Sequence, residues 1–129
     1  MQVSKKMLAL AGVAVVSLAA AAPASAHHSF AMFDNQKNVT LDGTVKDFQW
    51  TNPHSWIQLV VKDPATGKEV EYSIEGGSPN GLSRAGWKRT SLKPGDKAVA
   101  IIHPLKDGTN GGSLVSVSVN GVQIGGARS

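Results

Sequence analysis

The chain has 129 residues, no cysteine and a formal net charge of +4 at pH 7. Because the sequence lacks cysteine, disulfides, thiolate metal sites and the lipid anchor of a lipoprotein are excluded. A chain of this length can form one domain with a modest core and is too short for two.

The first 26 residues have the three parts of a secretory signal peptide. Lys5 and Lys6 form the positive region, Met7 to Ala22 is an apolar run, and Ala24 and Ala26 are the small residues that a signal peptidase reads. The apolar run is shorter than the roughly 20 residues of a spanning helix. We therefore expect cleavage after residue 26 rather than an uncleaved anchor, which predicts a periplasmic or secreted protein with no stable membrane insertion.

Cleavage would remove two of the 13 basic residues and leave 11 basic residues against 9 acidic ones. The mature chain would then be only weakly basic, and its longest basic run is Lys88-Arg89. We expect no nucleic-acid partner, because nucleic-acid binding needs a basic patch or stripe.

The mature chain is predicted to begin with an arm over residues 27–38, which Phe30 and Phe33 would anchor. From Val39 to Val45, apolar and polar residues alternate, as in a half-buried strand. Gly43 lies inside this strand and predicts a bulge or a sharp bend there.

A hairpin is predicted next, with strands over 56–61 and 69–74 on either side of the turn over 63–67. One short helix follows: Ser78 is a suitable N-cap, Pro79 suits the first helical position, and Gly86 can end the helix. We expect the indole rings of Trp56 and Trp87 to lie in the core.

The last part of the chain is predicted to contain a strand over 98–103, a flexible glycine-rich loop over 108–112, a strand over 114–119 and a short extension over 122–124. In the strand over 114–119, Val115, Val117 and Val119 alternate with serines, which predicts one apolar face. Asn120-Gly121 has the sequence of a tight hairpin turn.

This order of elements predicts an all-β fold with one short helix, a five-stranded OB-like Greek-key barrel whose helix lies between the third and fourth strands. Residues 39–125 would form the barrel and residues 126–129 a tail. A generic five-stranded roll is the alternative architecture.

Four segments together resemble an uncharacterised family of small exported domains from Gram-negative bacteria. They are the arm His27-His28-Ser29-Phe30-Ala31-Met32-Phe33-Asp34, the loop Trp50-Thr51-Asn52-Pro53-His54-Ser55-Trp56, the helix from Ser78-Pro79 to Gly86-Trp87, and the turn Leu92-Lys93-Pro94-Gly95-Asp96. The resemblance covers most of the mature chain. It implies export and one small domain, and it implies no particular chemistry.

Cleavage after residue 26 would make His27 the first mature residue, with a free amine and an imidazole that can chelate one metal ion. The pKa of an α-amine is near 7.7–8.0, so a metal ion can displace its proton at neutral pH. His28 could add an imidazole and a deprotonated backbone amide, a set that suits square-planar Cu(II) or Ni(II). Copper is therefore the first candidate cofactor, and the alternative is a frayed tail without a specific role.

His54 and His103 are candidates for further imidazole ligands. His54 lies in the loop between the first two predicted strands, and His103 ends the fourth strand. In an OB-fold these two loops border the usual binding face. The alternative is that His54 only hydrogen-bonds its own loop and that His103 is an ordinary residue at the end of a strand.

Four other residues are weaker candidates. Met32 is a soft ligand for Cu(I), and Asp34 could supply an oxygen ligand or orient an imidazole. Trp50 and Trp56 flank the loop that carries His54 and could form an aromatic platform for a ligand.

The sequence contains no G-x-S-x-G elbow, no H-E-x-x-H motif and no phosphate-binding loop, so we do not expect an enzyme. The leading hypothesis is a small periplasmic binding module that holds a copper-type metal through His27, with a periplasmic protein as a further candidate partner. The runner-up is a metal-free OB domain that binds a protein, a glycan or a small molecule through its rim loops. A third, more distant hypothesis is an oxidative copper enzyme.

Overall fold

The computed structural model describes residues 30–125, and the fold is mostly β with a single short helix in that range. In chain order the elements are η1 (Phe30–Met32), β1 (Val39–Gln49), β2 (Trp56–Lys62), β3 (Glu69–Glu75), α1 (Pro79–Arg84), β4 (Lys97–Pro104), β5 (Gly111–Val119) and β6 (Val122–Gln123). Within the described range no helix is long and apolar enough to cross a membrane. The predicted signal peptide and tail lie outside the described residues.

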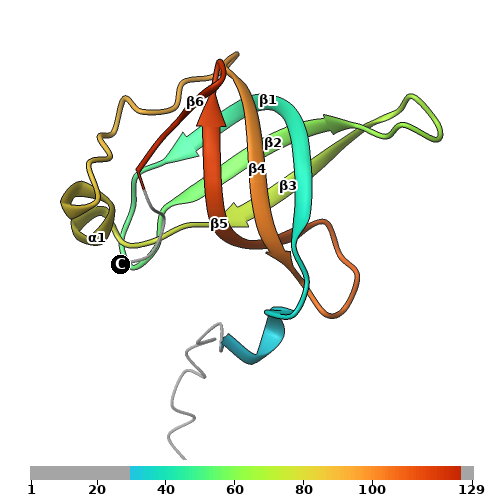
Figure 1. Ribbon diagram of the computed structural model, residues 1–129, viewed down its shortest axis with the longest axis horizontal. Helices are drawn as coiled ribbons and strands as arrows, with labels where there is room; N and C mark the ends of the chain where they lie inside the picture. The colour runs from blue at the N-terminus through green and yellow to red at the C-terminus, as the bar shows by residue number, and fades with distance from the viewer. Residues whose placement is uncertain (1–29, 126–129) are drawn as a thin grey trace, which may run out of the picture.

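Five of the strands close into a barrel (Figure 1). The hydrogen-bonded order is β3-β2-β1-β4-β5, and a short parallel pairing of β3 with β5 closes the ring. This is the strand order of an OB-fold, with the helix between the third and fourth strands. The predicted fold class is therefore confirmed, and the generic roll is excluded. β6 pairs only with β5 and lies outside the barrel.

The barrel interior is filled by apolar side chains from all five strands. Leu41 and Val45 of β1, Leu59 of β2 and Ile74 of β3 are almost completely buried, and the residues between them point outward or are only partly buried. This two-residue period is the alternation that predicted the strands. The barrel strands thus supply most of the core, and Leu82, Trp87 and Leu92 complete it from outside the strands.

The helix α1 begins and ends as predicted. The Ser78 hydroxyl accepts a hydrogen bond from the Gly81 amide, Pro79 is the first helical residue, and Gly86 follows the helix with a φ of +91°. Leu82 of α1 is buried in the core cluster, so the helix covers one end of the barrel, while the β2–β3 hairpin projects from the opposite side (Figure 1).

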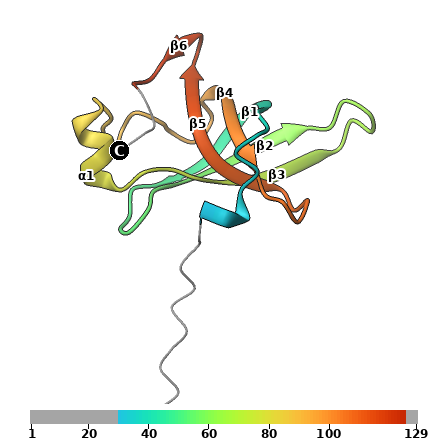
Figure 2. The same ribbon diagram turned by 60° about the horizontal axis from the view of Figure 1, so that its bottom comes forward.

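Trp87 lies directly after α1 and is buried, as expected. Its indole N–H donates to the Gly125 carbonyl at 2.8 Å, which holds the end of the described chain against α1 (Figure 2). Trp56 differs from the prediction: it is only half-buried and points outward, because its neighbour Ile57 takes the inward position. Trp50, instead, packs against the core cluster.

The glycine in β1 has a different role from the predicted bulge. The bulge between β1 and β2 lies between Val45 and Asp47, where Lys46 is the extra residue. Gly43 is regularly paired, but a β-carbon there would collide with the Val60 carbonyl oxygen. The glycine therefore permits a close approach of β1 to β2.

β5 also departs from the predicted boundaries. Gly111 and Gly112 belong to the strand rather than to a flexible loop, because β5 passes so close to β3 and β4 that a side chain has no room. Val115 is skipped in the pairing of β4 with β5, and the buried residues of β5 are Leu114 and Val117. The predicted face with Val115 is therefore wrong, since this bulge shifts the alternation.

Candidate functional site

Four strands bring one polar row together on the outside of the barrel. Trp56 of β2 pairs with Glu75 of β3, Glu75 pairs with Ser113 of β5, and Ser113 pairs with His103 of β4. Directly opposed residues on neighbouring strands share one face and lie about 5 Å apart. The row therefore runs from the start of β2, which follows the His54 loop, to the end of β4, which precedes the loop after His103.

His54 lies over the Glu75 end of this row. Its Nε2 is 3.4 Å from Oε1 of Glu75, and its Nδ1 is 3.2 Å from the Gly76 carbonyl oxygen. The hydroxyl of Thr51 donates to the His54 carbonyl at 3.0 Å, which holds the loop backbone. Because a carbonyl can only accept a hydrogen bond, Nδ1 carries a hydrogen, and in the neutral ring Nε2 has a lone pair that faces Glu75.

The carboxylate of Glu75 is unusual for its burial. Its side chain is only 8% exposed, whereas that of His54 is 44% exposed. Oε2 of Glu75 has no hydrogen-bond partner among the described residues, and neither has the buried hydroxyl of Ser55. Buried glutamates are rare unless they are paired, because removing a charge from water is costly.

His103 has a similar ring orientation in different surroundings. Its Nδ1 is 2.8 Å from the Lys37 carbonyl oxygen, so Nδ1 again carries the hydrogen and Nε2 is the free acceptor. Its register partner in the row is Ser113, which lies between it and Glu75. Within residues 30–125, no group of three or more His, Cys, Asp or Glu side chains could hold a metal ion. His54 and His103 are thus on one face but do not form a cluster.

The N-terminal arm runs beside the His103 end of the barrel. Phe33 is buried and forms an isolated bridge with Leu105, and the Met32 carbonyl accepts a hydrogen bond from the Lys106 amide (Figure 2). Phe33 is thus the predicted anchor, but Phe30 is not, since it is 81% exposed. Asp34 forms an ion pair with Lys37 at 3.4 Å. His27 and His28 lie outside the described residues.

The two tryptophans that flank the His54 loop do not share one environment. Trp50 packs edge-on against Phe48 with a centroid distance of 5.8 Å, and Phe48 also contacts Trp87. These rings form an aromatic cluster against the core. Trp56 belongs instead to the polar row beside Glu75.

Glu75 is the ionisable member of this arrangement that the sequence analysis missed. The third strand was expected to end at Ile74, which left Glu75 in the following loop. The alternation of β3 gives a signal, because Ile74 faces inward and Glu75 must face outward, opposite Trp56. Its burial depends on the His54 loop that covers it, and no pattern in the sequence indicates this.

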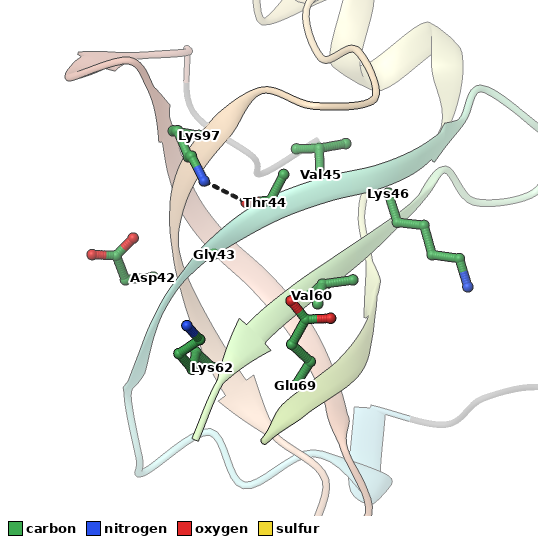
Figure 3. A pocket seen from close by; sticks show the side chains of 9 residues that line it. All are labelled: Asp42, Gly43, Thr44, Val45, Lys46, Val60, Lys62, Glu69 and Lys97. Atoms are coloured by element: carbon green, nitrogen blue, oxygen red, sulfur yellow. Dashed lines mark hydrogen bonds between the residues drawn. The ribbon is translucent and has the colours of Figure 1, made fainter. Parts of the chain in front are cut away.

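A second feature of the surface is a shallow hollow of about 590 Å³ whose lining comes mainly from β1 and β2 and contains no histidine (Figure 3). It contains three lysines, of which Lys97 donates to the Thr44 hydroxyl and Lys46 donates to Glu71 at 2.7 Å. The hydrogen bond and the charge of Glu71 raise the pKa of Lys46. Two of the three ammonium groups are therefore already engaged, and the hollow is not a preformed anion site.

Comparison with known proteins identifies the family but no activity. The model of a family of unknown function, DUF6152, matches residues 14–115. The chain belongs to this family. No curated protein and no solved structure matches the chain. The matched residues include Glu75 and all four histidines of the chain. The predicted membership of an uncharacterised family is confirmed.

Proposed function

We propose that the chain is an exported, periplasmic binding module that holds a copper-type metal ion through the mature N-terminal His27. The signal-like first 26 residues and the resemblance to exported Gram-negative domains support the export. The free amine and the ring of His27 would supply two nitrogen ligands. His28 would supply more, and His54 and His103 are candidates for the remaining positions.

The observation that carries this proposal is the shared orientation of the two described imidazoles. His54 and His103 each donate Nδ1–H to a backbone carbonyl and keep Nε2 for another partner. Histidines that bind metals almost always have this arrangement, because a hydrogen bond to the other ring nitrogen fixes the tautomer and the ring orientation. Both rings are on the outer row, where an ion from solvent has access.

The length of the arm is compatible with this proposal. Phe33 is held beside Leu105 and follows His27 by six positions, and six extended residues span at most about 20 Å. Leu105 is two residues beyond His103, about 7 Å along the strand. The mature N-terminus is therefore within reach of the His103 end of the row.

The first measurement is the intact mass of the exported protein, with an expected N-terminus at His27. Titration with Cu²⁺ should then give one site per chain, and one additional alanine before His27 should weaken it strongly by removing the amine chelate. Equal copper affinity with and without that alanine contradicts the proposal. A different outcome favours the metal-free binding module. In that case both forms bind Cu²⁺ equally weakly, and a protein, glycan or small-molecule ligand changes the fluorescence of Trp56.

A further inference from the structure

The contact between His54 and Glu75 places two acceptors face to face. In the neutral ring, Nε2 of His54 has a lone pair, and a carboxylate oxygen has only lone pairs to offer. They are nevertheless 3.4 Å apart, with the other ring nitrogen bound to the Gly76 carbonyl. Such a contact is stable only with a positive charge between or on the two groups, either a proton or a metal ion.

We propose that His54 and Glu75 form a binding site for a tetrahedral divalent cation of the zinc type, with Nε2 of His54 and the Glu75 carboxylate as the protein ligands. This site goes beyond the proposed copper site, because it does not need the amine of His27. Glu75 is a ligand that the copper hypothesis did not include.

The separation of the two atoms favours a tetrahedral ion. Two ligands at about 2.1 Å from a tetrahedral ion are about 3.4 Å apart, whereas two adjacent ligands of a square-planar ion at that distance are about 3.0 Å apart. The distance between Nε2 of His54 and Oε1 of Glu75 is 3.4 Å. The spacing of the pair is therefore compatible with zinc-type coordination.

The burial of Glu75 supplies a second, independent observation. The side chain is more than nine-tenths buried, and its Oε2 has no hydrogen-bond partner among residues 30–125. A proton on His54 would satisfy only Oε1, through one long hydrogen bond. A cation bound at Oε1 would neutralise the charge of this buried carboxylate more fully than one long hydrogen bond does.

The surroundings of the pair are those of an open metal site. The Gly76 carbonyl orients the imidazole, and the Thr51 hydroxyl holds the loop that carries it. Because the His54 side chain is 44% exposed, an ion can enter from solvent and keep water at its remaining positions. Two protein ligands predict a weak, exchangeable site rather than a structural one.

The test uses the full 129-residue chain, in which His27 is internal and has no free amine. The probe is Zn²⁺ alone, and the readouts are calorimetric titration and the shift in Tm that zinc causes. We expect one site per chain. Glu75→Gln, which keeps the shape of the side chain, and His54→Gln, at a partly exposed position, should each weaken zinc binding by roughly tenfold or more.

Glu69→Gln is the matched control, because Glu69 is an exposed glutamate on the same strand. It should leave the zinc affinity unchanged. Equal zinc affinity in the unaltered chain, Glu75→Gln and His54→Gln overturns the inference and leaves the pair as a protonated ion pair. Because His54 is a candidate ligand in both proposals, the two are distinguished by the other variants: an alanine before His27 tests the amine chelate of the copper proposal, and Glu75→Gln tests the zinc site.

Discussion

The two ends of the outer row carry histidines with the same ring orientation but different neighbours. His54 and His103 both donate Nδ1–H to a backbone carbonyl. Only His54 faces a buried carboxylate, whereas the register neighbour of His103 is Ser113. The backbone thus orients the ring in both cases, while a buried carboxylate in contact with the ring is present only at His54 among the described residues.

Under the two proposals above, the barrel would carry two kinds of metal site. The His54 end has an anionic ligand within the described fold and is expected to attract a cation by itself. The His103 ring has no carboxylate contact among residues 30–125, and in the copper proposal its further ligands would come from His27 and His28. The comparison therefore predicts that changes at the two ends have separable effects.

The row exists only while β5 remains tightly packed between β3 and β4, so its largest disruption should come from Gly112. A β-carbon at Gly112 would collide with the His103 carbonyl oxygen and approach the Ile102 side chain to 2.8 Å. Because a backbone atom must move, Gly112→Ala should cost about 3 kcal/mol in the free energy of unfolding, measured in urea.

Gly108→Ala is the control for this substitution. A β-carbon at Gly108 meets nothing within 4 Å, although its φ is +79°. The left-handed backbone alone should cost about 1 kcal/mol. If both substitutions destabilise the protein equally, the close packing of β5 does not maintain the row.

Removal of each imidazole, measured without added metal, should lower the free energy of unfolding by different amounts at His54 and His103. His54→Ala leaves the buried Glu75 carboxylate without its partner and should cost about 2 kcal/mol, whereas His103→Ala loses one hydrogen bond and should cost about 1 kcal/mol. Urea unfolding at pH 7 measures both. On a Glu75→Gln background, His54→Ala should become less costly by at least about 0.5 kcal/mol. Additive losses would mean that His54 and Glu75 do not interact.

Much of the barrel could be predicted from local patterns. Alternation identified the inward residues Leu41, Val45 and Ile74, and the residues that cap and end α1 were correct because helix ends obey local rules. The bulges at Lys46 and Val115 could not be predicted, since a bulge is decided by the pairing of two strands that are distant in sequence.

The candidate site was predictable in its histidines but not in its carboxylate. His54 and His103 were identified because strand ends and loops could be placed along the chain. Glu75 became visible only through three long-range relations: its register opposite Trp56, its parallel pairing with Ser113, and the loop that buries it. The register also explains why Trp56 faces outward beside Glu75, while Trp50 packs against the core cluster.

The smallest predicted effect concerns the loop that follows His103. It tests whether the charge of this loop influences the pair of His54 and Glu75. The hydroxyl and the backbone N–H of Thr109 both donate to Asp107, and these hydrogen bonds lower the pKa of the Asp107 carboxyl. A lowered pKa in the folded state adds stability that is present above the unfolded pKa and is lost as the pH falls through the folded pKa.

In Thr109→Ala the hydroxyl is lost but the N–H remains, so the pKa of Asp107 should rise part of the way to its ordinary value. An NMR titration of the Asp107 carboxyl measures this rise, and the ring signals of His103 and His54 serve as internal controls. A simultaneous change in the His54 signals would show that the loop and the Glu75 end are coupled, and the two ends of the row could then no longer be treated as independent sites.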